Sequence, residues 1–232
     1  MRTRLTVLTA AALVAVVMVC GGVASAQEGP TAAAKKTKTI SFSKNFSNTQ
    51  TITIPLNPAL PLGADINANP YPSQIHAALK KSLRKAKVTD VNLRLNGFTH
   101  TFPDDVDILL AHGGKTATIF SDVGGSTDVS GLSITLNQQA STPLPDLIDL
   151  TSGTFKPTDV EIPDIFGFDA GLDNFPAPAP LDSGQKSLSA FNGTRAFGAW
   201  KLFITDDFGM DDQGQISSGW TLQIKAKARV RR

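Results

Sequence analysis

The chain has 232 residues, and its 22 Lys and Arg against 20 Asp and Glu give a formal net charge of +2. This balance argues against a nucleic-acid-binding domain, which would carry a clear basic excess. The one cysteine, Cys20, lies close to the N-terminus. The rest of the chain therefore has no disulfide to support it, but it is long enough to build a hydrophobic core instead.

The first 26 residues have the features of a secretion signal. Arg2 and Arg4 precede an apolar run from Leu5 to Val19, and Ala24-Ser25-Ala26 fits a small-x-small cleavage site. The run is short for a membrane-spanning helix, which needs about 20 residues. We therefore expect a secreted, extracellular protein that is cleaved after Ala26 and has no membrane anchor in its mature chain. Loss of the two arginines would bring the net charge from +2 to zero.

Residues 27–46 are predicted to be disordered or poorly ordered, because they begin with a run rich in Ala, Thr and Lys. Residues 51–55 alternate in polarity and end at a proline, which is typical of an edge strand. Residues 56–71 contain several prolines and are predicted to form a loop. The next segment, residues 75–87, allows two interpretations, because its composition favours an amphipathic helix while a strand, a turn and a second strand also fit.

The middle of the chain contains two more runs that alternate as half-buried strands do, at residues 106–110 and 132–136. Residues 159–187 are predicted to form a long loop rich in Pro, Gly and Asp. Its Phe175–Pro180 stretch favours polyproline II, either as a stiff surface loop, which we expect, or as a ligand for an aromatic groove. Turns are predicted at Asn96-Gly97, Gly113-Gly114 and Gly124-Gly125.

The last third of the chain contains two strand-like runs, and each begins at a tryptophan. Trp200 and Trp220 share their side of each run with aliphatic residues, whereas the intervening positions face the other way. We therefore expect both tryptophans in the core, with a loop at residues 206–219 between the two runs. The basic residues 227–232 are predicted to be a solvated tail, and a phosphate-binding or anchoring role is the alternative. Many short strands with turn signals together predict an all-β fold, an antiparallel sandwich or jelly roll.

Several motifs, taken in order, resemble a known domain family. They are Thr99-His100-Thr101-Phe102, Ser152-Gly153-Thr154-Phe155-Lys156-Pro157, Leu188-Ser189-Ala190-Phe191-Asn192-Gly193 and the two tryptophan runs. The match covers roughly residues 47–226 and resembles the P domain (P/Homo B) of subtilisin-like proprotein convertases. The family's Gly and Leu are replaced by Asp104 and Val106, and its Pro-x-Gly turn by His112-Gly113-Gly114.

The resemblance implies a jelly-roll β-sandwich related to galactose-binding-like folds. It also places a strand at residues 75–79, a turn near Lys81-Ser82 and a return into Val88, which we follow because tertiary pairing overrides local propensity. In the family this domain stabilises and regulates an attached protease. We expect a stand-alone, non-catalytic module that binds a protein or cell-surface partner or assists a separate protease. The alternative function is a carbohydrate- or cell-surface-binding jelly roll, which exposed aromatic side chains would favour.

No catalytic residues are predicted. A subtilisin-type enzyme needs a histidine beside a nucleophilic serine, and no serine-nucleophile motif accompanies His76, His100 or His112. His100 is expected to be a buried, hydrogen-bonded structural residue. Gly114-Lys115-Thr116 lacks the preceding glycine of a P-loop, and no helix is expected to follow it. Zinc is not expected, because the mature chain has no cysteine and its histidines are scattered.

Two groups of aspartates are the best candidates for a binding site. Crowded carboxylates repel one another, and a hard cation such as calcium, which takes 6–8 oxygen ligands, would relieve the repulsion. Asp105 and Asp107 are expected to share one face of a strand, about 7 Å apart. Solvated turn aspartates are the alternative, because Asp favours turns. The candidate calcium ligands are Asp104, Asp105, Asp107, Asp206, Asp207, Asp211 and Asp212.

Overall fold

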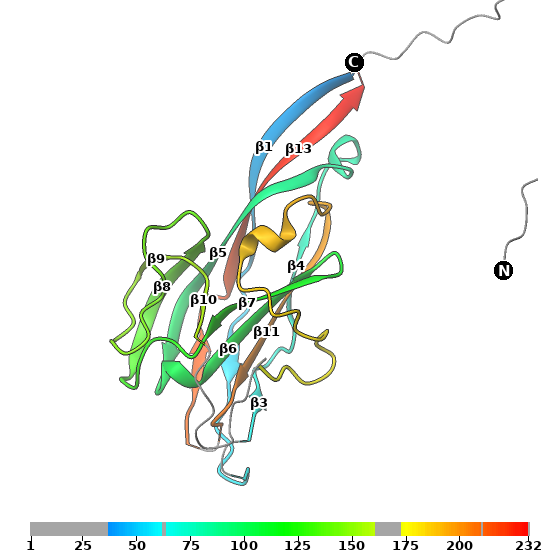
Figure 1. Cartoon of the computed structure of the whole chain (residues 1–232). Coiled ribbons are helices and arrows are strands. Elements are labelled where there is room, and N and C mark those ends of the chain that lie inside the picture. The colour runs from blue at the N-terminus through cyan, green and yellow to red at the C-terminus, as the bar shows by residue number, and fades with distance from the viewer. Residues whose placement is uncertain (1–36, 62–63, 161–172, 210, 232) are drawn as a thin grey trace, which may run out of the picture. The chain divides into compact units, whose positions relative to one another are not determined.

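A computed structural model describes residues 37–61, 64–160, 173–209 and 211–231 of the chain (Figure 1). The predicted signal segment and its cleavage site lie outside these residues. No helix in the described ranges has the length and apolar character needed to cross a membrane.

The described residues form thirteen strands in two sheets, joined by loops and three short 3-10 helices. The larger sheet has the order β1-β13-β5-β12-β2, with β8 beside β5 and β9 beside β8. The smaller sheet has the order β10-β7-β6-β11-β3, and β4 also pairs with β11. Strand pairs are antiparallel except β7–β10 and β8–β9, which are parallel. The elements are β1 (Thr37–Asn48), β2 (Ile52–Ile54), β3 (Ile66–Asn67), β4 (Ser73–Ala77), η1 (Lys81–Leu83), β5 (Lys87–His100), η2 (Pro103–Asp105), β6 (Val106–His112), β7 (Lys115–Ser121), β8 (Val129–Asn137), β9 (Gly153–Phe155), β10 (Thr158–Asp159), η3 (Leu188–Phe191), β11 (Gly198–Asp206), β12 (Gly214–Ile216) and β13 (Trp220–Arg231).

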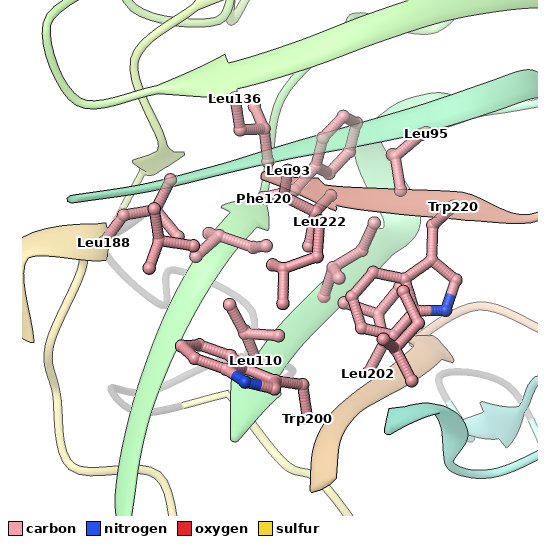
Figure 2. Close-up of a cluster of buried hydrophobic side chains, with 14 of the residues drawn as sticks. Leu93, Leu95, Leu110, Phe120, Leu136, Leu188, Trp200, Leu202, Trp220 and Leu222 are labelled. Carbon is pink, nitrogen blue, oxygen red and sulfur yellow. The ribbon is translucent and has the colours of Figure 1, made fainter. Parts of the chain in front are cut away.

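The hydrophobic core lies between the two sheets, as Figure 2 shows. Leu93 and Leu222 of the larger sheet pack in one cluster with Leu110 of the smaller sheet. Trp200 and Trp220 are both 0% exposed, which confirms the prediction that they are core residues. Burial of two large aromatic side chains from different sheets joins the layers across the middle of the fold. The all-β, two-sheet architecture expected from the sequence is therefore present.

Residues 75–87 adopt the strand–turn–strand arrangement and not the helix that local propensity favoured. Strand β4 pairs with β11, so that Ile75 lies opposite Trp200. The 3-10 helix η1 then turns the chain into β5. Alternate residues of β4 are buried, as expected for a strand with one face on the core. The predicted edge strand at residues 51–55 is also confirmed, because β2 lies at the end of its sheet.

The predicted boundaries of the sandwich in the sequence, residues 47 and 226, are wrong at both ends. Residues 37–46, expected to be poorly ordered, belong to β1, and most of the predicted tail at residues 227–232 belongs to β13, which runs to Arg231. The two strands pair along their whole length, from Thr37 opposite Arg231 to Asn48 opposite Trp220. This mutual pairing supplies the backbone hydrogen bonds, and β1 side chains that include Phe42 pack against the core.

The outer face of the smaller sheet is more buried than a half-buried strand would be. Phe203, expected to face away from the core, is 0% exposed and packs with Leu109 and Phe175 in a second apolar cluster. Phe175 belongs to the described end of the predicted long loop, and this part of the loop covers the outer face of the sheet. The Tyr71 hydroxyl fixes the loop there by donating a hydrogen bond to the Pro176 carbonyl at 3.0 Å. The predicted loop at residues 206–219 also contains a short strand, β12, which pairs with both β5 and β2.

Candidate metal centre

The two predicted groups of aspartates meet at one edge of the smaller sheet. Strand β6 begins where β11 ends, so that Asp206 lies opposite Val106 and Thr205 lies opposite Asp107. The 3-10 helix η2 directly precedes β6 and begins at Pro103, whose fixed φ suits the first position of a helical turn. The Asp207 amide donates a hydrogen bond to the Asp105 carbonyl at 3.0 Å. Strand pairing thus joins carboxylates that are about a hundred residues apart in the sequence.

Three of these carboxylates form a compact set. Asp105, Asp206 and Asp207 each offer an oxygen, and these oxygens all lie within 4.8 Å of one another. Calcium binds oxygen ligands at about 2.3–2.6 Å, so ligands of one ion lie within about 5 Å of one another. We call Asp105, Asp206 and Asp207 the carboxylate triad. Its geometry is compatible with a single hard cation held by all three.

Asp206 is the most deeply buried member of the carboxylate triad. Its side chain is 0% exposed, and one oxygen accepts a hydrogen bond from the Phe208 amide at 2.9 Å. The other oxygen, Oδ2, lies 3.2 Å from His100 Nε2 on the opposite sheet but has no hydrogen-bond donor within the described residues. A buried carboxylate oxygen that lacks a donor is costly. A cation at this point would satisfy it.

His100 is a buried structural residue, as the sequence predicted. It is 1% exposed, and its Nδ1 lies 2.9 Å from the Phe102 carbonyl. Strand β12 passes directly beside its ring, where a Cβ on Gly214 would collide with the imidazole. The glycine therefore allows the close approach that holds His100 toward Asp206.

Electrostatic repulsion within the triad is strong. The pKa of Asp105 is raised to about 9, first by burial and then by the neighbouring Asp207, Asp206 and Asp212. Asp212 is held in place by the Thr101 hydroxyl, which donates to its Oδ1 at 2.7 Å. Within the described residues, no Lys or Arg forms an ion pair with Asp105 or Asp206. Without a cation, Asp105 therefore holds a proton at neutral pH.

A second acidic group lies next to the triad. The pKa of Asp107 is raised well above its ordinary value, first by burial and then by Asp173, Asp207 and Asp122, while a hydrogen bond with Ser121 lowers it. The Ser121 hydroxyl lies 3.1 Å from Asp122 Oδ2 and 3.0 Å from Asp173 Oδ1. Because Asp207 acts on both Asp105 and Asp107, the two groups are electrostatically one region.

Sequence reasoning missed Asp122 and Asp173. Asp122 follows β7 in a turn and has a φ of 51°, in the left-handed region that Asp tolerates better than most residues. The turn signal at Gly124-Gly125 marked this segment, but nothing local shows that it faces β6. Asp173 comes from the long loop and approaches the site only through tertiary packing.

The expectation that Asp105 and Asp107 share one face of a strand is wrong. Asp105 belongs to η2 and Asp107 to β6, so Asp105 faces the triad while Asp107 faces Asp173 and Asp122. Asp104 also lies apart from the triad, because the groups that shift its pKa are Asp146 and the Gly125 amide. Asp211 is exposed on the β11–β12 loop. The structure therefore gathers five of the seven predicted ligands: Asp105, Asp107, Asp206, Asp207 and Asp212.

The histidines make no contact typical of a nucleophilic enzyme. Within the described residues, no Ser, Thr or Cys side chain is hydrogen-bonded to His76, His100 or His112. The two ring nitrogens of His112 lie 2.7 and 2.6 Å from the carbonyls of Ala199 and Arg195, and its ring stacks on Trp200. Gly114 lies in the β6–β7 turn, and β7 starts at Lys115 without an intervening helix.

Comparison with known proteins leaves this geometry as the main evidence on function. No family model matches the chain, and neither a curated protein nor a solved structure matches it.

Proposed function

We propose that the protein is a non-catalytic, calcium-binding β-sandwich module. The observation that carries this proposal is the carboxylate triad, three oxygens within 4.8 Å of one another around a fully buried Asp206. An all-oxygen ligand set favours calcium or magnesium over zinc, which prefers nitrogen and sulfur. Calcium also tolerates irregular geometry, whereas magnesium demands a nearly ideal octahedron.

Bound calcium would connect parts of the chain that otherwise repel one another. Asp105 comes from η2, Asp206 from the end of β11 and Asp207 from the loop that leads to β12. One divalent ion at the triad neutralises two of the negative charges that raise the pKa of Asp105. Asp212 and Asp107 lie next to it and would contribute to its field or to its outer ligands. The ion would act in stabilisation, because no Ser, Thr or Cys side chain of the described residues is hydrogen-bonded to His100, the histidine beside the triad.

The biological role that we propose is non-covalent and extracellular. The resemblance to the P domain supports a jelly-roll module that binds a protein or cell-surface partner or assists a separate protease. Thr99–Phe102, which carries part of that resemblance, leads into the triad, and His100 within it contacts Asp206. Secretion, with cleavage after Ala26, is part of the same proposal. The alternative, a carbohydrate- or cell-surface-binding jelly roll, gains no support from Trp200 and Trp220, which are fully buried.

The test is thermal unfolding of residues 27–232 with calcium, magnesium or a chelator. A ligand that binds only the folded state stabilises it by about 2.7 kcal/mol at a concentration of 100 Kd. We expect calcium to raise Tm and Asp207→Asn to reduce this rise strongly. Asp211→Asn is the matched control, because Asp211 is an exposed aspartate of the same loop outside the triad. Equal Tm values in calcium and in chelator would contradict the proposal.

A further inference from the structure

A row of positive charges follows the outer face of β13. Lys225, Lys227, Arg229 and Arg231 are exposed and alternate with Ala226 and Ala228, which are buried, and with Val230, which is half-buried. Alternate residues of a strand lie on one face at intervals of about 7 Å, so the row spans roughly 20 Å. We call these four side chains the cationic row. They belong to a paired strand and not to a flexible tail, so their spacing is fixed.

A neighbouring strand adds a fifth positive charge. Lys87 of β5 lies directly opposite Lys227 in the antiparallel register. Like charges in directly opposite positions destabilise a sheet, and an anion bound between them would remove this cost. Lys225 is paired with Asp90 at 2.9 Å, whereas Lys87, Lys227, Arg229 and Arg231 form no ion pair within the described residues.

The cationic row is bordered by hydroxyl and amide groups. Side chains of β1 directly opposite β13 lie on the same face, and those on the outer face are Thr37, Thr39, Ser41, Ser43, Asn45 and Ser47. Beyond Lys225 the face becomes a shallow groove of about 220 Å³, lined by Asn45, Asn92, Arg94, Asn96, Thr135, Thr221, Gln223 and the edge of Leu93.

Hydrogen bonds hold the groove side chains in place. The Asn92 amide donates to Gln223 Oε1 at 3.0 Å, Arg94 donates to the Ser133 hydroxyl at 3.0 Å, and the hydroxyls of Ser47 and Thr221 lie 3.0 Å apart. Asn92 Oδ1 is buried and has no hydrogen-bond partner within the described residues.

The chemistry of this face favours one class of polymer. Single-stranded nucleic acids are bound with aromatic side chains for base stacking, and the aromatic residues of β1, Phe42 and Phe46, point to the opposite face. Peripheral membrane binding combines basic residues with apolar side chains that enter the lipid, and the outward positions of β1 and β13 carry none. Regularly spaced cations, hydroxyls and amides on one face of a sheet instead match an extended chain that carries both anionic groups and hydroxyl groups.

We propose that the outer face of β1, β13 and β5 binds a linear acidic polysaccharide that lies along β13. Its sulfate or carboxylate groups contact the cationic row and Lys87, and its hydroxyls contact the groove. This binding narrows the carbohydrate-binding alternative to an acidic polymer and needs no platform of exposed aromatic side chains. It is also independent of the carboxylate triad, so either proposal can fail without the other.

Heparin is the probe for the test. The mature chain should bind an immobilised heparin fragment, and affinity should fall linearly with the logarithm of salt concentration, as counterion release requires. Lys227→Gln combined with Arg229→Gln should weaken binding at least tenfold near 50 mM salt and reduce the salt slope by about two. The matched control is Lys115→Gln combined with Lys201→Gln, which removes the same charge from exposed positions of the smaller sheet and should change affinity less than twofold.

A groove variant separates a polysaccharide site from general attraction to polyanions. Asn92→Ala combined with Gln223→Ala should weaken heparin binding several-fold and leave weak binding to double-stranded DNA unchanged. The Tm of every variant and its response to calcium serve as the folding control. The proposal is overturned by any of three results: no heparin binding at low salt, an equal loss in the control pair, or equal or tighter binding to DNA or to phosphatidylserine vesicles.

Discussion

The two ends of this sandwich carry opposite charges in opposite ways (Figure 1). At the end formed by η2, β3 and the last residues of β11, aspartates are buried together, and the pKa of Asp105 is raised to about 9. At the end where β1 and β13 extend beyond the other strands, the cations are exposed and solvated. A net charge of +2 hides this division. This difference shows that the location of a charge decides which ligand can neutralise it. Buried carboxylates can be neutralised only by a small ion that fits between them, whereas exposed cations can bind a large ligand at the surface.

The largest effect that we expect comes from the core shared by both ends. Trp220→Ala removes a fully buried indole whose Nε1 donates to the Ser73 hydroxyl at 3.0 Å, and it should cost about 3–5 kcal/mol of unfolding free energy. Calcium response and heparin binding should weaken together, because both depend on the same sandwich. Chemical denaturation provides the measurement. A cost below about 1 kcal/mol would show that Trp220 does not hold the sheets together.

The second effect distinguishes the two ends by pH. The folded-state pKa of Asp105 is raised from 3.8 to about 9, so its contribution to stability is fully present below pH 3.8 and is lost as pH rises toward 9. In chelator, stability should therefore fall by on the order of a few kcal/mol over this range. Calcium should flatten the profile, because it replaces the protons. Asp105→Asn should make the profile shallower without calcium and leave the part that Asp107 contributes, and a profile unchanged by that substitution would contradict this account.

The smallest effect concerns Asp90, a carboxylate beside the cationic row. Asp90→Ala breaks an ion pair in which the Lys225 side chain is 51% exposed and the Asp90 side chain 14% exposed, and it should cost about 1 kcal/mol of stability. Heparin binding should become tighter by a few-fold, because Lys225 becomes free to bind the polymer. Elution salt from a heparin column measures the change. Weaker binding by this variant would show that Asp90 orients the site and does not merely compete with the polymer.

Patterns within one segment predicted the strands well. Alternation placed Trp200 and Trp220 in the core and identified β6 and β8, whereas the strand at residues 75–79 was predicted from the resemblance to the P domain. Strand β1 was missed because its outward side chains are almost all hydroxyls and its partner lies at the other end of the chain. Strand β12 was missed because three residues, Gly214–Ile216, give no period to detect.

The candidate site was predictable only in part, for a similar reason. Clustered aspartates in the sequence pointed to Asp105, Asp206, Asp207 and Asp212, which do meet. Asp122 and Asp173 are single aspartates in a turn and a loop, and only the folded chain brings them beside Asp107. The cationic row was interpreted as a tail, because charge alone does not show whether a segment pairs with a strand.

The pairing of β1 with β13 also has a consequence for the order of folding. Ser47 and Thr221, which contact each other across this pair, are 174 residues apart. Strand β1 is synthesised well before its partner β13. The two strands can therefore pair only after β13 has been made, and such long-range pairing folds slowly. Until then β1 is unpaired and open to a β13 strand from another molecule. Refolding at high protein concentration should therefore produce strand-exchanged dimers before it produces aggregates of any other kind.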